Sequence, residues 1–476
     1  MMVNGISGIL VCSIVLLALA DCGAVQEYLP TPVPAFVPDS NSILMPTTIE
    51  NPVTSKASSA QEDKEESIAG QEFTLDTAIQ WALKADPQIQ AGLENIHQAK
   101  ADLMTAGLVP NPNFYANEEL VPVPFSRPFS PTHEGGPPQL NALVQFPVDW
   151  FLFGKRAAAV VAAQRGVDVA AADFAELIRQ RISGTITAFY DVLEAEAMVE
   201  LAKEDLSNLS KMKTIITNRV KIGGIATIEL DRIRLSIFSS QRELQAVGLV
   251  LAAARNRLCV FLGFEDPIPL RVRGDLKVTH PAAPISTEVA IALAEENRPD
   301  FIAKQRQIVE VAAKVKSEKK QAYPEISPFL GYSRQFQQQA MGVPDANSWN
   351  FGIQMEMPLF DRNQGNIAKM KSALIQSKLN FKAQLVALRA EIDQSVRNYR
   401  TIYQIITTED PGQLKAARDV RDKIQASYKL GGKSLIEVLD ARRTYLETYR
   451  IHIASRSGYW HSLYALNAAI GKQVLK

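Results

Sequence analysis

The chain has 476 residues, with 51 basic and 51 acidic side chains that cancel to a formal net charge of zero. This balance argues against a nucleic-acid-binding protein, because affinity for phosphates comes from an excess of Lys and Arg. Three cysteines are too few for a disulfide-stabilised scaffold. After the first twenty residues no run of eighteen apolar residues follows. We therefore expect no transmembrane helix there, and any membrane span would have to be built from strands.

The first 22 residues are typical of an export leader. The stretch 9–20 is apolar but too short to cross a bilayer, and it ends in a small-x-small cleavage site at Ala20. Cys22 follows in a sequence that approximates a lipobox, so either cleavage after Ala20 or acylation of Cys22 fits the pattern. Residues 23–70 are rich in Pro, Ser, Thr and Glu, a composition that predicts an extended tether without a core of its own.

The rest of the chain repeats itself. Landmarks of the first half return in the same order with nearly constant spacing (429 − 221 = 208 and 324 − 110 = 214 at the extremes). The pairs are Asp86-Pro87 with Arg298-Pro299, Pro110 with Pro324, Pro147 with Pro358, Lys221-Ile222-Gly223-Gly224 with Lys429-Leu430-Gly431-Gly432, and Leu262-Gly263 with Ile470-Gly471. This order predicts a duplication, with a first structural repeat at 71–263, a linker at 264–285 and a second repeat at 286–472.

Each repeat predicts a helix, two strands, a long helix and a returning helix. The opening helices are expected at about 75–109 and 287–323. Four strands are expected near 114–123, 140–146, 326–333 and 349–357, and the last alternates apolar and polar residues most regularly. A half-polar strand of this kind fits either a soluble sandwich or a membrane barrel with a wet interior.

The long helices are the most unusual elements. No proline interrupts residues 154–223, which would give roughly 100 Å of helix. The second repeat offers 365–431, broken only at Asp410-Pro411, and shorter helices return at 225–262 and 433–470. Helices of such length imply coiled-coil partners.

The number of strands constrains the assembly. Four strands cannot close a barrel, and an open sheet edge cannot lie in lipid. Three copies would supply twelve strands, an even number within the known range of membrane barrels. The sequence therefore predicts a mainly α protein with a membrane β-barrel part, in which a trimer forms a 12-stranded barrel continued by an α-helical barrel.

Two other readings remain open. In the first, the strands form a soluble β-domain, and the protein is a periplasmic coiled-coil structural or adaptor-like protein. In the second, it is a periplasmic enzyme, but the sequence has no nucleophile–base arrangement, phosphate loop or dinucleotide fingerprint, so we expect no enzyme and no cofactor. No metal site is expected either: His97, His133, His280, His452 and His461 lack ligand spacing, and Cys259 reads as a core residue.

One motif resembles that of a known family. The sequence 428–440, Tyr-Lys-Leu-Gly-Gly-Lys-Ser-Leu-Ile-Glu-Val-Leu-Asp, is similar to the inter-helix tip motif of TolC-like outer membrane efflux proteins. The resemblance covers about residues 72–472, and Val109-Pro-Asn-Pro112 resembles the start of the first strand in the heavy-metal branch. It implies a homotrimeric passive conduit that exports metal ions or drugs and works with a periplasmic adaptor and an inner-membrane pump of the RND type. It also implies a location in the outer membrane of a Gram-negative bacterium, extending into the periplasm, with the 264–285 linker and the break near residue 410 in an equatorial belt.

The resemblance also implies functional residues at the tip. Family members close their periplasmic end with acidic rings, and the matching positions are Glu437 and Asp440. Six carboxylates around a three-fold axis would favour cations. The alternative is local, because Ser434 and Glu437 form a capping-box sequence, and acids stabilise a helix N-terminus in any case.

Further expectations concern the closed state. The matching link positions are Glu229 with Lys433, as an ion pair, and Tyr428 with Arg456, as a hydrogen bond. The alternative is that these are surface pairs worth only ~0–1 kcal/mol each. Gly223, Gly224, Gly431 and Gly432 are expected to form left-handed turns that end the long helices. Their contact with an adaptor protein is implied by the resemblance alone.

Overall fold

The computed structural model describes residues 72–121, 137–266, 268, 270–408 and 411–475. The expected leader, Cys22, His133 and the 23–70 tether lie outside the described residues. The strands are β1 (Glu72–Phe73), β2 (Asn113–Glu119), β3 (Gln139–Gln145), β4 (Arg271–Val272), β5 (Glu325–Gln335) and β6 (Ala346–Glu356). The helices are α3 (Leu75–Ala85), α4 (Pro87–Gly107), α5 (Asp149–Leu152), α6 (Lys155–Lys221), α7 (Thr227–Leu262), α8 (Thr287–Asn297), α9 (Pro299–Gln321), α10 (Gln337–Met341), α11 (Gln364–Thr408), α12 (Pro411–Lys429) and α13 (Leu435–Ile470).

The opening helix of each repeat is broken, so the prediction of single helices at 75–109 and 287–323 was wrong. The first break falls at Asp86 and the second at Arg298, and both residues adopt an extended backbone conformation before a proline at the first helical position. A proline ring disfavours the α conformation of the residue that precedes it. The two prolines therefore end one helix and begin the next.

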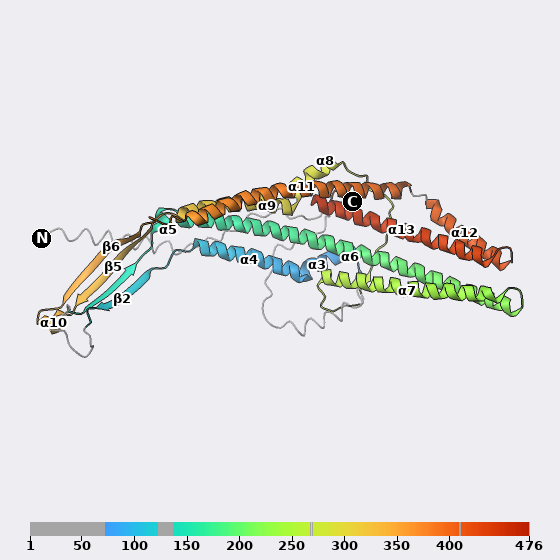
Figure 1. Ribbon diagram of the computed structural model, residues 1–476, viewed down its shortest axis with the longest axis horizontal. Coiled ribbons are helices and arrows are strands. Elements are labelled where there is room, and N and C mark those ends of the chain that lie inside the picture. The colour runs from blue at the N-terminus through green and yellow to red at the C-terminus, as the bar shows by residue number, and fades with distance from the viewer. Residues whose placement is uncertain (1–71, 122–136, 267, 269, 409–410, 476) are drawn as a thin grey trace. The chain divides into compact units, whose positions relative to one another are not determined.

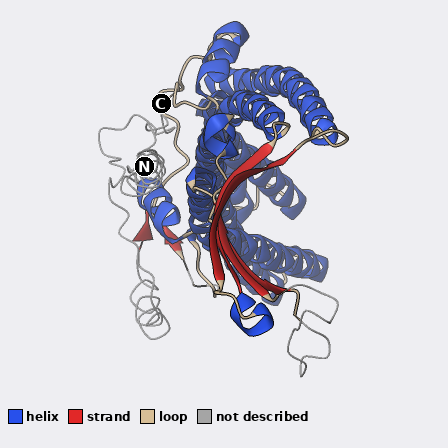
Figure 2. Cartoon of the chain, turned by 90° about the vertical axis from the view of Figure 1, so that its left-hand side faces the viewer, coloured by secondary structure: helices blue, strands red, loops and turns tan. Residues whose placement is uncertain are grey.

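The larger sheet joins the strands of both halves of the chain. Its order is β2-β3-β5-β6, and every neighbouring pair is antiparallel. The strands form one curved layer (Figure 2). Strands β2 and β6 are the two edges, and within the described residues neither outer edge has a partner strand. A separate two-stranded parallel pair, β1 with β4, was not predicted.

The two faces of this sheet differ in chemistry. On one face amide and hydroxyl side chains bond across the strands: Ser333 Oγ lies 2.8 Å from Asn141 Oδ1, and Gln145 donates to Gln354 at 2.6 Å. The opposite face carries exposed apolar side chains from all four strands, namely Phe114, Leu140, Leu330, Trp349, Phe351, Ile353 and Met355. The face pattern expected mainly for 349–357 therefore extends over the whole sheet.

The long helices form two hairpins. Helix α6 contacts α7 along the first hairpin and also packs against α4, α9 and α13, while α12 packs against α13 in the second (Figure 1). Two buried clusters occupy related positions in the two halves, with offsets of 208 to 212 residues (470 − 262 = 208; 290 − 78 = 212). The related residues are Ala78, Ala82, Ile186 and Leu262 in one cluster and Ala290, Ala294, Val396 and Ile470 in the other.

An ion pair at the related breaks has opposite polarity in the two halves. Asp86 pairs with Arg181 of α6, whereas Arg298 donates to Glu391 of α11 at 2.7 Å. Glu391 stands 210 positions after Arg181 (391 − 181 = 210), and Arg298 stands 212 after Asp86 (298 − 86 = 212). In each half an ion pair therefore joins the break in the opening helix to the long helix, but the acid and the base are exchanged.

We expected no helix suited to crossing a membrane, and helix α7 is an exception. Among the described helices it is long and apolar enough by length and composition, with a mean hydropathy of 1.3 over its most apolar window. It nevertheless pairs with α6 through Arg255 and Glu196 at 2.7 Å and through Arg257 and Asp191 at 3.1 Å. Only 11% of the window is buried in one chain, so α7 presents an apolar face that one chain leaves uncovered.

Candidate functional site

Each hairpin ends in a tight glycine turn. Gly223 and Gly431 have φ angles of +74° and +87°, in the left-handed region that favours glycine. The next glycines, Gly224 and Gly432, donate to the carbonyls of Arg219 and Ser427 at 2.9 Å. This pairing is a Schellman motif, which satisfies the last carbonyls of α6 and α12. The side chains of Ile222 and Leu430, just before the glycines, are more than 80% exposed.

Tyr428 joins the two hairpins near the turns. Its ring is 2% exposed, and its hydroxyl donates to Glu229 Oε2 on α7 at 2.9 Å. Burial, together with this bond to Glu229, raises the pKa of Tyr428 to about 12. Arg219, in the last turn of α6, donates to the carbonyls of Tyr428 and Lys429 at 2.9 Å each and lies over the Tyr428 ring. The first hairpin thus binds both the side chain and the main chain at the end of α12.

Both carboxylate oxygens of Glu437 accept hydrogen bonds from residues at the start of α13. Its Oε1 accepts from Lys433 Nζ at 2.6 Å, and its Oε2 accepts from the Ser434 amide at 2.9 Å. The Ser434 hydroxyl in turn accepts from the Glu437 amide, which completes a capping box. The hydrogen bond from Lys433, then that from the Ser434 amide, lowers the pKa of Glu437 to about 2. Glu437 is therefore ionised, with a cation beside it.

Asp440 also has a cationic neighbour. Arg443 Nη2 donates to its Oδ1 at 3.0 Å, and both side chains are largely exposed. The acids at positions 437 and 440 are each matched by a base of the same chain. A ring formed by these positions would therefore carry less negative charge than the carboxylates alone suggest.

The structure does not bring together the expected link pairs within one chain. Glu229 bonds Tyr428, and Lys433 bonds Glu437. Arg456 donates to His452 Nε2 at 2.7 Å, and it lies 21 residues along α13 from Leu435 (456 − 435 = 21), or about 30 Å. The partners of Tyr428 and Lys433 within the chain are therefore not the expected ones.

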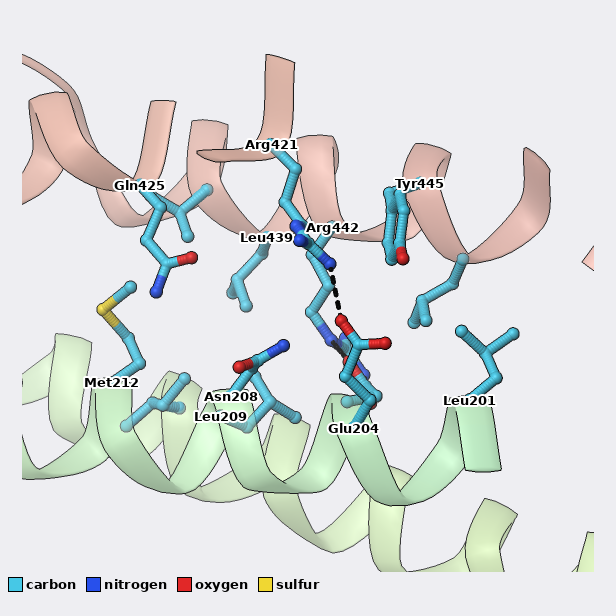
Figure 3. Close-up of a pocket in the computed structure, with 14 residues that line it drawn as sticks. Leu201, Glu204, Asn208, Leu209, Met212, Arg421, Gln425, Leu439, Arg442 and Tyr445 are labelled. Atoms are coloured by element: carbon cyan, nitrogen blue, oxygen red, sulfur yellow. Dashed lines mark hydrogen bonds and ion pairs between the residues drawn. The ribbon is translucent and has the colours of Figure 1, made fainter. Parts of the chain in front are cut away.

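Another contact between the hairpins lies further along them, away from the glycine turns. It was not expected from the sequence. Arg421 of α12 faces Glu204 of α6 across the seam between them (Figure 3), with 3.2 Å between Nη1 and Oε1. Asp205, the next residue on α6, accepts two bonds from Arg442 of α13. Neither partner could be found from sequence spacing, because Asp205 and Arg442 are 237 positions apart.

Within the described residues no group of three or more His, Cys, Asp or Glu side chains is placed to hold a metal ion. Cys259 is buried in the first core cluster, and its Sγ faces the Ile268 carbonyl at 3.8 Å. His461 pairs with Asp191 at 3.2 Å, and His97 pairs with Glu94 on its own helix.

Long helical hairpins attached to a small sheet with one polar and one apolar face define the class of outer-membrane channels that combine strands with long helices. Solved structures have this fold. The Campylobacter jejuni CmeC outer membrane channel matches with a TM-score of 0.70 at 18% identity, over 84% of this chain and 87% of that chain. A crystal structure of CusC matches with a TM-score of 0.66 at 18% identity, over 84% and 92%.

Sequence comparisons give the family. The sequence model described as "Outer membrane efflux protein" matches residues 78–263 and 290–472. Among curated proteins, the cobalt-zinc-cadmium resistance protein CzcC of Cupriavidus metallidurans is 24% identical over 379 residues, 78% of this chain and 84% of that protein. The cation efflux system protein CusC of Escherichia coli is 22% identical over 273 residues, 56% and 58% of the two chains.

The chain belongs to the outer membrane efflux protein family. It is an outer-membrane channel protein of a Gram-negative efflux system, and it extends into the periplasm. Members of the family work together with an adaptor and an inner-membrane pump.

Proposed function

We propose that three copies of this chain pool their strands into one 12-stranded β-barrel and their helices into an α-helical barrel, forming a passive exit duct. The observation that carries this proposal is the sheet with two unlike faces and two open edges. An open edge cannot lie in lipid, so β2 and β6 must find partners, and copies of the same chain supply them. The apolar face then meets lipid, while the face with Asn141, Ser333 and Gln354 lines a wet lumen.

The exposed face of α7 supports the same assembly. Phe238, Leu249 and Val260 are each more than half exposed and stand 11 residues apart (249 − 238 = 11; 260 − 249 = 11). Eleven residues are three helical turns, so these side chains share one face. On this face they alternate with polar residues, among them Arg242 and Gln245. Exposed apolar side chains spaced along a helix in this way are suited to contact a helix of a neighbouring copy in a closed helical barrel.

The alternative reading, a periplasmic coiled-coil protein with a soluble β-domain, is less well supported. A soluble sandwich would cover its apolar face with a second sheet or a helix. On β6, Trp349, Phe351 and Ile353 are at least 70% exposed. Within the described residues no second layer lies over them.

We further propose that the hairpin tips form the closed periplasmic end of the duct. Glu437 and Asp440 would ring the axis beside their partners Lys433 and Arg443, and Tyr428 with Glu229 would hold the hairpins closed. The turns at Gly223-Gly224 and Gly431-Gly432, with exposed Ile222 and Leu430, would face the adaptor. The inner-membrane partner is proposed to be a pump of the RND type.

Metal cations are the proposed cargo. CzcC is named for cobalt, zinc and cadmium resistance and CusC for cation efflux. The pump would choose the ion, and this chain would conduct it.

The proposal extends to the organisation of the chain. Residues 1–22 would direct export, and acylation at Cys22 would anchor the tether 23–70. Residues 71–263 and 286–472 would be duplicated units joined by an equatorial linker at 264–285.

The test is the assembly state in the membrane. Outer-membrane fractions are extracted in mild detergent, cross-linked and analysed for subunit number. A trimer in the outer-membrane fraction supports the pooled barrel. A water-soluble monomer or dimer would overturn the barrel and leave the coiled-coil reading.

A further inference from the structure

A compact cluster links all four helices of the two hairpins below the tips. Asp205 of α6 is its centre, with a side chain only 7% exposed. Arg442 of α13 donates from Nε to Oδ1 and from Nη2 to Oδ2, at 2.5 Å each. Ser240 of α7 donates to Oδ2 at 2.7 Å. The carboxylate is therefore paired in a fork geometry and bonded a third time, as a buried charge requires.

A second arm of the cluster reaches the remaining helix. Glu204 precedes Asp205, and successive residues on a helix point about 100° apart, so the two acids can face different helices. Arg421 of α12 pairs with Glu204 at 3.2 Å and with Asp422 at 2.8 Å. Its guanidinium lies 4.0 Å from the centre of the Tyr445 ring of α13. One turn of α6 thus holds both helices of the second hairpin.

The cluster is closely packed on one side and borders an open hollow on the other. Leucines from both hairpins flank the ion pairs, among them Leu201, Leu209 and Leu439 (Figure 3). The cavity between these leucines is only about 30 Å³. Next to it, Asp205, Ser240 and Arg442 also line an open hollow of about 500 Å³ between the hairpins.

The contacts at the tips are of a different kind. There the hairpins are joined by an apolar cluster that includes Ile216, Ile233 and Leu435. The polar contacts are one side-chain hydrogen bond, Tyr428 to Glu229, and the bonds of Arg219 to main-chain carbonyls. Loss of the Tyr428 bond leaves no buried charge without a partner. Parting Asp205 from Arg442 would leave a buried carboxylate unpaired, which is much less favourable. The two levels are separated by 17 residues of α6 (222 − 205 = 17), or about 25 Å.

We propose that the Asp205–Arg442–Ser240 cluster, with Glu204 and Arg421, is a fulcrum that stays closed when the tips part. The two hairpins then move as one body at this level, and only the segments beyond it, about residues 206–239 and 422–441, separate to open the duct. This inference rests on the proposed tip gate and names the residues about which that gate turns.

A reversible cross-link tests the fulcrum directly. All channels carry Cys259→Ala, and the gate is loosened by Tyr428→Phe, which removes the hydroxyl that bonds Glu229. Asp205→Cys and Arg442→Cys are then added and joined by a short bis-thiosulfonate reagent, with conductance measured in planar bilayers before and after reduction. We expect the cross-linked channel to keep the raised conductance of Tyr428→Phe. Loss of that increase on cross-linking, with recovery on reduction, would overturn the fulcrum.

A matched cross-link at the tip separates the two hypotheses. Glu229→Cys with Tyr428→Cys, joined by the same reagent, is expected to abolish the current and to recover it on reduction. If neither Tyr428→Phe nor this cross-link changes the conductance, the tip gate itself fails, and the fulcrum fails with it.

A second measurement leaves the cluster intact. Amide hydrogen exchange is compared between the wild type and Tyr428→Phe. The fulcrum predicts loss of protection at 222–229 and unchanged protection at 198–205. Equal loss at both levels would contradict it.

Discussion

At the scale of single residues, each acidic side chain proposed to form the gate at the tip has a basic side chain of the same chain beside it. Glu437 accepts hydrogen bonds from the Ser434 amide at the start of α13 and from Lys433, and Asp440 accepts one from Arg443. The capping role of Glu437 is observed in the geometry, and the gate role is a proposal that adds to it. Only the gate role needs an ionised carboxylate, and the two roles predict different consequences when the cations or the acids are removed.

The capping contact should depend on pH. The pKa of Glu437 is lowered in the folded chain from 4.5 to about 2, so its contribution to stability is complete above about pH 4.5 and is lost as the pH falls towards 2. Hydrogen exchange of residues 434–438 should therefore lose protection over that window. Glu437→Gln keeps the capping hydrogen bonds but has no charge to titrate, so its protection should stay flat. A parallel decline in both proteins would contradict this assignment.

Conductance distinguishes the gate role from capping. Glu437→Ala with Asp440→Ala should raise conductance and weaken cation preference, because the proposed ring loses its carboxylates. Lys433→Ala with Arg443→Ala should strengthen cation preference, because the same carboxylates then lack their neighbours. Reversal potentials in a salt gradient measure both effects. Identical reversal potentials for both variants and the wild type would leave only the capping role.

At the scale of the elements, the inverted ion pairs distinguish otherwise similar helices. Asp86 meets Arg181 in the first half, and Arg298 meets Glu391 in the second. If α4 packed against α11, Asp86 would face Glu391, and if α9 offered Arg298 to Arg181, two cations would meet. The exchange of acid and base therefore favours the pairing observed at the two breaks, Asp86 with α6 and Arg298 with α11, while α9 also packs against α6.

The role of these ion pairs can be tested by placing the aspartate of the first pair at the related position of the second pair. Arg298→Asp places a carboxylate beside Glu391 and Asp300, both now bonded to Arg298, and removes the donor to the Ala469 carbonyl. Because a buried ion pair is broken, we expect a loss of about 3–5 kcal/mol in the free energy of unfolding. Adding Glu391→Arg, which copies Arg181, should recover part of it. Thermal unfolding in detergent measures both, and a further loss on adding Glu391→Arg would contradict the argument.

At the scale of the whole molecule, the sheet is incomplete in one chain and is proposed to be completed by copies. Gly352 of β6 illustrates how closely its polar face packs. A Cβ at this position would lie 2.7 Å from the Phe329 ring of β5, so only glycine leaves room for that ring. The opposite face is left open to the surroundings.

Neighbouring positions on β6 test which face meets lipid. Phe351 is 84% exposed on the apolar face, and Asn350 lies on the polar face, where it donates to Ser333. Phe351→Lys should impair outer-membrane assembly, with a cost of about 2–4 kcal/mol for a lysine near the bilayer midplane. Asn350→Lys should assemble nearly normally. Trimer yield in outer-membrane fractions measures both, and the reverse order would exchange the two faces.

The sequence by itself determined the features that depend on neighbours along the chain. Strand alternation, proline-free helical runs, the Gly-Gly turns and the Ser434 capping box are local patterns, and the landmarks of the repeat need only counting. The same patterns missed the breaks at Asp86 and Arg298, where a proline that can begin a helix was read as lying within one.

Only the tertiary structure decided which distant residues meet. Arg219 bonds the end of α12, Tyr428 bonds Glu229 in place of Arg456, and Asp205 pairs with Arg442, all across some 200 positions. Strand β3 pairs with β5 across the entire first hairpin. The physical reason is that helix packing sets these partners through the rotation and height of each helix, and a sequence of one chain records neither.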